Sequence, residues 1–147
     1  YDLTQMSPEQ IVLALHPRDE HSREHTAGLA ELAHQALFQL GIALNASNAA
    51  TAVPYPADAY RLIGRLVELA DVLRMLAERT GYRQVEFGKM DGLALDSMGP
   101  DEDPKLANYH VFAFLESAAE LLSGASDSLN RAYRHARRLK IDEPREV

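Results

Sequence analysis

The segment Arg-Leu-Ile-Gly-Arg-Leu-Val-Glu-Leu-Ala-Asp-Val-Leu-Arg-Met-Leu, residues 61–76, decides the fold class of this chain. Every third or fourth residue in it is a leucine: Leu62, Leu66, Leu69, Leu73 and Leu76. A 4-3-4-3 spacing is the heptad seam of a helix that buries one stripe against other helices. The seam is too short to require an extended coiled coil, and it equally suits the core of an antiparallel bundle.

Capping residues and apolar periodicity place two helices before this segment. Ser7-Pro8-Glu9-Gln10 contains the residues of a capping box, with proline at the first helical position. It predicts a short helix over about 7–15. Apolar residues then recur every three or four positions from Leu29 to Leu44, which predicts a long helix over about 19–45.

Proline and glycine set the boundaries of the remaining helices. The leucine-seam helix should span about 56–80, because it begins with a proline and is followed by Gly81, a typical helix stop. Asp103 and Pro104 are the cap and first residue of a last helix over about 104–140. The connecting segment, residues 81–103, is rich in glycine and should be irregular. Within it, Tyr82–Phe87 suits either a short strand or a helix extension.

Composition supports one all-α domain over residues 1–147. Alanine and leucine dominate the apolar residues, aromatic residues make up only 7%, and tryptophan is absent. These values favour helices over a β-sandwich or barrel. We therefore predict a mainly antiparallel helical bundle with one short N-terminal helix and three long helices.

Charge and cysteine content exclude several classes of function. The net charge is −7 and the chain has no cysteine, so it has neither disulfides nor a thiolate nucleophile, and a nucleic-acid partner is disfavoured. No apolar run approaches the length of a membrane span, and the N-terminus does not look like a signal peptide, so we expect a cytoplasmic protein without membrane contact. One basic run stands out as a candidate patch for an anionic partner, although cations at a helix C-terminus also satisfy the helix dipole. It comprises Arg131, Arg134, Arg137, Arg138 and Lys140.

Three short motifs are compatible with metal chemistry. His21-Ser-Arg-Glu24-His25 has the H-x-x-E-H order of inverzincins, but it lacks an evident third ligand. Glu31 and His34 have the Glu-x-x-His spacing of di-iron bundles, which use that motif twice. Glu68-Leu-Ala-Asp71 is similar to half of the magnesium site of all-α nucleotide pyrophosphohydrolases, whose upstream Glu-x-x-Glu is absent here. We predict no bound metal or cofactor; His21 and His25 are the metal-ligand candidates.

The bundle pattern favours a non-enzymatic interaction or assembly module that forms a homodimer. Three long helices bury a small core, so the outer side of the leucine seam, or of Phe112 and Phe114, would need a partner. We expect the last helix to supply the interface, with Gly124 letting two copies cross closely. The candidate interface residues are Tyr109, Phe112, Leu115, Leu122, Gly124 and Leu129. The alternative is a metal- or magnesium-dependent bundle enzyme that acts on a nucleotide or another small molecule.

Overall fold

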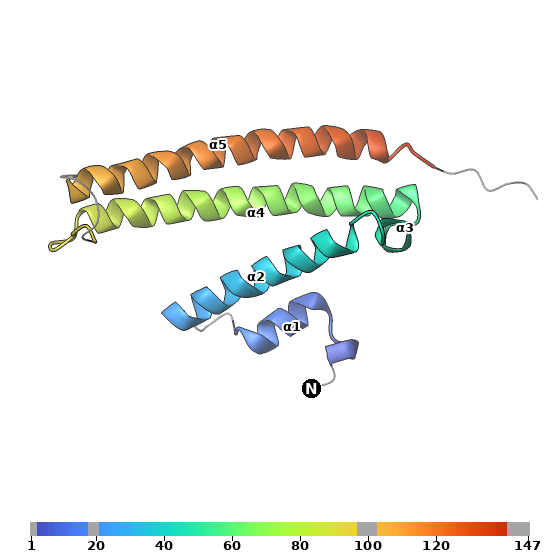
Figure 1. Ribbon diagram of the computed structural model, residues 1–147, viewed down its shortest axis with the longest axis horizontal. Coiled ribbons are helices and arrows are strands. Elements are labelled where there is room, and N and C mark those ends of the chain that lie inside the picture. Colours follow the sequence, from blue (N-terminus) through green and yellow to red (C-terminus); the bar gives the residue numbers. More distant parts are fainter. Residues whose placement is uncertain (1–2, 18–20, 97–102, 141–147) are drawn as a thin grey trace, which may run out of the picture. The chain divides into compact units, whose positions relative to one another are not determined.

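The computed structural model describes residues 3–17, 21–96 and 103–140, and these ranges are built mainly of helices (Figure 1). Helices hold 79% of the described residues, and no strand occurs among them. The predicted all-α class is therefore confirmed. The elements are η1 (Leu3–Gln5), α1 (Pro8–Leu15), α2 (Arg23–Ala43), α3 (Ala49–Ala52), α4 (Pro56–Gly88) and α5 (Pro104–Ala136).

The chain divides into two compact units, Tyr1–Pro54 and Tyr55–Val147. In the first unit, α1 and α2 meet where the His16 ring lies against Gly28. A Cβ on Gly28 would be only 2.7 Å from His16 Cε1, so the glycine makes this contact possible. No described residue of α1, α2 or α3 is fully buried. The assignment of the whole chain to one domain stays a prediction.

The first turns of α1 and α5 are capped by side chains, as predicted from the sequence. The Ser7 hydroxyl accepts a hydrogen bond from the Gln10 backbone N–H at 3.2 Å, and the Gln10 side chain accepts one from the Ser7 N–H at 2.7 Å. The predicted capping box of α1 is therefore confirmed. At the start of α5, the Asp103 carboxylate accepts from the Lys105 backbone N–H at 3.0 Å.

The second helix is shorter than its predicted range of 19–45. It begins at Arg23 because the Ser22 hydroxyl accepts a hydrogen bond from the His25 backbone N–H at 3.1 Å and caps the first turn. The predicted start at 19 lies outside the described residues. At its other end α2 stops at Ala43 instead of 45, and the short helix α3 follows before α4 begins.

The helix of the leucine seam continues past the predicted stop at residue 80 and ends at Gly88. Gly81 does not break it, because this glycine is buried against α5. Its Cβ position would lie 3.5 Å from Phe112 Cδ2 and 3.8 Å from Leu115 Cβ. Packing of α5 on the bare backbone outweighs the roughly 1 kcal/mol cost of a mid-helix glycine. Of the two alternatives for Tyr82–Phe87, the helix extension is correct.

The irregular segment therefore begins after Gly88 rather than at 81, and residues 97–102 within it lie outside the described part of the chain. The last helix begins at Pro104 as predicted but ends at Ala136 instead of 140. There the N–H groups of Arg138 and Leu139 bond to carbonyls three residues back, and such tight bonds close the final turn.

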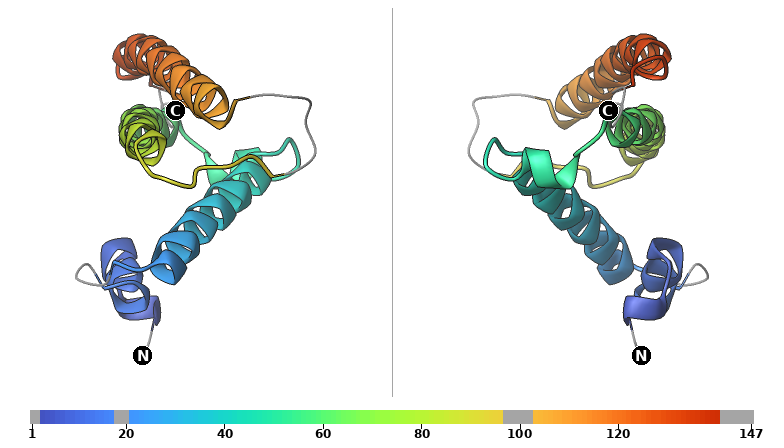
Figure 2. Two further views of the ribbon diagram at one scale, coloured as in Figure 1. Left: turned by 90° about the vertical axis from the view of Figure 1, so that its left-hand side faces the viewer. Right: turned by 90° about the vertical axis from the view of Figure 1, so that its right-hand side faces the viewer.

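In the second unit, α4 and α5 lie side by side as a hairpin of two long helices that run in opposite directions (Figures 1 and 2). Tyr60, near the start of α4, stacks on Tyr133, near the end of α5. At the opposite end, the Asn108 side chain donates a hydrogen bond to the Gln84 carbonyl at 2.8 Å. The two helices are therefore held together by side-chain contacts near both ends of the hairpin.

Candidate interaction surface

A ladder of contacts fixes the register of α4 against α5. The rings of Tyr60 and Tyr133 stack with centroids 4.4 Å apart, and Tyr133 also lies against Gly64. Asp71 lies seven residues after Gly64 on α4, and Ser126 lies seven residues before Tyr133 on α5. The Asp71 carboxylate accepts a hydrogen bond from the Ser126 hydroxyl. Equal steps on both helices keep one register along the hairpin, as in a coiled coil.

The tyrosine pair closes the end of the hairpin where α4 begins and α5 ends. The hydroxyl groups of Tyr60 and Tyr133 share a hydrogen bond. This bond, together with burial, raises the pKa of Tyr133 above its ordinary value. The Tyr133 phenol therefore stays protonated at neutral pH.

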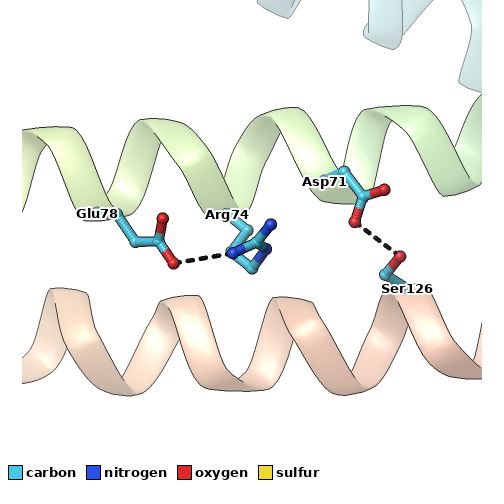
Figure 3. Close-up of polar contacts among 4 residues, drawn as sticks. All are labelled: Asp71, Arg74, Glu78 and Ser126. Atoms are coloured by element: carbon cyan, nitrogen blue, oxygen red, sulfur yellow. Dashed lines mark hydrogen bonds and ion pairs between the residues drawn. The ribbon is translucent and has the colours of Figure 1, made fainter.

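The most buried residues of the hairpin are small. Ala70 and Ala119 are each 6% exposed, and so is Ser126. The Ser126 hydroxyl donates to the Asp71 carboxylate at 2.8 Å and ties the two helices together (Figure 3). Small side chains at the contact let the helix axes approach closely, but they bury little apolar area.

Removal of the Ser126 hydroxyl should loosen the hairpin. We expect Ser126→Ala to lower the free energy of unfolding by about 1 kcal/mol, since a hydrogen bond is worth roughly this much in a partly hydrated site. Asp71→Ala should cost a similar amount, and the double variant little more, because both changes remove the same bond. Urea unfolding of the four proteins measures these energies. Strictly additive effects would contradict the bond.

One side of the hairpin is charged. A cavity of about 320 Å³ opens there between the helices, with Phe112, Ala119 and Gly81 among its apolar lining. Residues from both helices line it, so these residues lie on the same side of the hairpin. We call this side the charged face and define it by Arg74, Glu78, Tyr82, Glu116 and Glu120.

Helix geometry places a stripe without charged residues on the opposite side of the hairpin. Helix geometry places Leu73 about 140° around α4 from Glu78, and Ala118 about 160° around α5 from Glu120. The sector of α4 around Leu73 contains no Asp, Glu, Lys or Arg between residues 62 and 80. The sector of α5 around Ala118 contains none between residues 107 and 132. We call this side the uncharged face; it comprises Leu62, Leu66, Leu69, Leu73, Leu76 and Thr80 of α4, and Ala107, Val111, Phe114, Ala118, Leu121, Ala125 and Ala132 of α5.

Large apolar side chains on the uncharged face are open to solvent. Phe114 is 76% exposed and Leu121 is 74% exposed. On α4, Leu73 and Leu76 of the predicted seam are also exposed. The contacts between α4 and α5 that involve Gly64, Asp71 and Gly81 lie in the sector of α4 next to the leucine seam. Leu62, Leu66 and Leu69 of the seam are half-buried.

The interface residues predicted from the sequence differ in burial and in their contacts. Phe112 and Leu115 pack on α4 at Gly81, inside the hairpin. Leu122 and Leu129 are half-buried, whereas Tyr109 is exposed. Leu121 and the alanines of the uncharged face are not among the interface residues predicted from the sequence. The signal that would have found them is the seven-residue repeat of Ala118, Ala125 and Ala132.

Gly124 does not mark a close approach within the chain. It is exposed, and no atom lies within 4 Å of the position that its Cβ would occupy. The helix passes through it without interruption. Helix geometry also directs it away from α4, outside the uncharged face.

The basic run lies at the end of α5. Arg131 and Arg134 belong to its last turns, Arg137 is the C-cap residue, and Arg138 and Lys140 follow. All five side chains are exposed. Their position favours interaction with the helix dipole; an anionic partner for them stays a prediction.

The candidate metal ligands are dispersed or otherwise engaged. The His25 ring meets the His16 ring edge to face, with centroids 5.5 Å apart, and His21 is exposed. Glu31 accepts a hydrogen bond from the Gln35 side chain at 2.8 Å, while His34 is exposed. Among the residues that the structure describes, no group of three or more His, Asp or Glu is placed to hold a metal ion.

The acids of the Glu-x-x-Asp motif are also engaged separately. Glu68 pairs with Arg65 at 2.6 Å on the surface of α4, whereas Asp71 bonds across to Ser126.

In the described ranges, no helix combines the length and hydropathy that a membrane span needs. A comparison of the chain with family models, curated proteins and solved structures gave no match.

Proposed function

We propose that the chain is a non-enzymatic helical interaction module that self-associates, with the uncharged face of the hairpin as its binding surface. The observation that carries the proposal is the set of exposed apolar side chains on the uncharged face, among which Phe114 is 76% and Leu121 is 74% exposed. Contiguous exposed apolar surface on this scale marks interaction sites.

The size of the uncharged face is sufficient for a homodimer interface. Both helices contribute to it only where residues 62–80 of α4 lie beside α5, a length of roughly 27 Å at 1.5 Å per residue. With 8–10 Å between the helix axes the face is roughly 20 Å wide, or about 540 Å² per copy. Two such faces bury about 1,100 Å², just above the roughly 1,000 Å² that a specific interface needs. Two hairpins joined in this way would complete an antiparallel four-helix bundle.

Contacts of the acidic residues also favour an interaction module over the alternative enzyme. Glu78 is paired with Arg74 at 3.0 Å, and Glu68 with Arg65. Asp71 accepts the bond that links the two helices. These three acids of α4 therefore already serve as structural contacts, which supports a role for the hairpin as a scaffold.

Light scattering coupled to size-exclusion chromatography tests the proposal directly. We expect the intact chain at micromolar concentration to have twice the 16.3 kDa mass of one copy. Its melting temperature should rise with protein concentration, because dimer formation stabilises the folded state by mass action. A monomeric mass at these concentrations would overturn the proposal.

The Gly124→Leu variant distinguishes the uncharged face from the interface predicted from the sequence, in which two α5 helices cross at Gly124. Because Gly124 faces open space outside the uncharged face, we expect the variant to keep the wild-type association state. Leucine is also a better helix former than glycine by roughly 0.8 kcal/mol, so the melting temperature should rise slightly. Loss of the dimer in this variant would instead support a crossing of two α5 helices at Gly124.

A further inference from the structure

The end of the hairpin where α4 begins and α5 ends is positively charged. Tyr60 stacks on Tyr133, and Gly64 lies against the same ring, so residues 56–68 and the end of α5 lie together. We call the charged residues of 56–68 and 131–140 the basic end. It comprises the cations Arg61, Arg65, Arg131, Arg134, Arg137, Arg138 and Lys140, and the acids Asp58 and Glu68.

Positive charge is confined to a short part of the hairpin. Seven cations against two acids give the basic end a net charge of +5. Because the whole chain is at −7, all other residues together carry −12. The next charged residues along the two helices are Asp71 and Asp127, both acids. The positive surface is therefore only roughly 15–20 Å long at 1.5 Å per residue.

This confinement favours a compact anionic partner over an extended one. A nucleic acid or an anionic membrane surface would also meet the negative charge of the rest of the chain. A short acidic segment of a protein would contact the basic end alone.

The arginines of the basic end have N–H groups available for further carboxylates. The Arg61 and Arg65 side chains are 79% and 77% exposed, and each pairs with an acid of its own helix, Asp58 at 3.8 Å and Glu68 at 2.6 Å. A guanidinium has five N–H donors, so one such neighbour leaves donors for a second carboxylate. Three exposed arginines make no ion pair among the described residues: Arg131, Arg134 and Arg138.

A hollow of about 440 Å³ lies beside the tyrosine pair within the basic end. The rings of Tyr60 and Tyr133 and the bare backbone of Gly64 line it, and so do Arg61 and Arg65. This volume is ample for one aromatic side chain. A pocket for an apolar side chain with a polar rim is the arrangement that concentrates binding energy in protein interfaces.

We infer that the basic end docks an acidic segment of a partner protein. One apolar side chain of this segment occupies the hollow, and its carboxylates pair with the surrounding arginines, whose planar N–H groups match a carboxylate in two parallel hydrogen bonds. The cations of the basic end lie outside the uncharged face, so this inference does not depend on self-association.

A fluorescein-labelled peptide with glutamates on both sides of a central phenylalanine tests the inference by fluorescence anisotropy with the intact chain. We expect saturable binding that weakens as salt is added, because salt screens exposed charges. A peptide with glutamines in place of the glutamates should not bind. A peptide with alanine in place of phenylalanine should bind at least about fivefold more weakly, because the buried ring is lost.

Two double variants locate the binding surface. Arg61→Ala with Arg134→Ala removes one cation of the basic end from each helix and should raise the dissociation constant at least about tenfold, since hydrogen bonds between charged groups are lost. Arg79→Ala with Lys105→Ala is the matched control, because it removes two exposed cations from the other half of the hairpin. Its dissociation constant should stay within about twofold of the wild-type value.

Several outcomes would overturn the inference. These are no saturable binding at millimolar peptide, equal binding of the phenylalanine and alanine peptides, and equal effects of the two double variants. A single-stranded oligonucleotide, and vesicles of phosphatidylserine and phosphatidylcholine in equal parts, are titrated at the same salt concentration. Tighter binding of either than of the peptide would overturn the assignment to an acidic protein segment.

Light scattering tests the proposed function separately from this inference. A monomeric chain that binds the peptide would overturn the homodimer and leave the docking site standing. A dimeric chain that does not bind the peptide would overturn the docking site and leave the proposed function standing.

Discussion

Leu73→Asp should abolish self-association. Leu73 is 43% exposed in the single hairpin, but it lies at the centre of the proposed interface. The twofold symmetry would bury two aspartates per dimer and remove two leucine contacts. An unpaired charge costs several kcal/mol to bury, and each 1.4 kcal/mol is tenfold in affinity. We expect the dissociation constant of the dimer to rise at least about a thousand-fold. Light scattering at micromolar concentration should then give the mass of a monomer.

Val72→Asp is the matched control for this experiment. Val72 is the neighbouring residue, is also apolar and is 46% exposed, so the same charge is introduced at a site of equal exposure. One residue turns the side chain by about 100°, which moves it off the uncharged face. This variant should remain dimeric. Equal behaviour of the two variants, whether both dimeric or both monomeric, would contradict the assignment of the face.

Ala70→Glu should disrupt the hairpin itself. Ala70 is 6% exposed and lies in the small-residue contact between α4 and α5. A glutamate there places a carboxylate without a partner between the helices and forces them apart. The combined desolvation and overpacking amount to several kcal/mol, a large part of the stability of a small domain. We expect a lower melting temperature and less helix by circular dichroism at every protein concentration.

The effect of Ala70→Glu differs from that of an interface variant in its dependence on concentration. Loss of hairpin packing lowers the stability of each copy, so raising the protein concentration should not restore the helix content. Val72→Glu places the same side chain two residues away on an exposed position and should melt like the wild type. A wild-type melting curve for Ala70→Glu would show that Ala70 is not part of the core.

The sequence by itself determined the features that depend on nearby residues. The all-α class, the capping box at Ser7 and the start of α5 after Asp103 were predicted correctly. Each is decided within three or four residues, by a side chain that satisfies a backbone N–H of the first turn or by leucines that recur with the helical period. These interactions are local, and they form in the same way whatever the rest of the chain does.

Only the tertiary structure decided how the faces of the helices are used. The leucine seam looked like the contact face of α4, but Gly64 and Gly81, which contact α5, lie in the adjacent sector. The physical reason is that small residues admit a second helix at close range, whereas periodicity reports which side is apolar and not which partner it meets. For the same reason Gly81 and Gly124 are equivalent in the sequence, yet one is buried under Phe112 and the other faces open space.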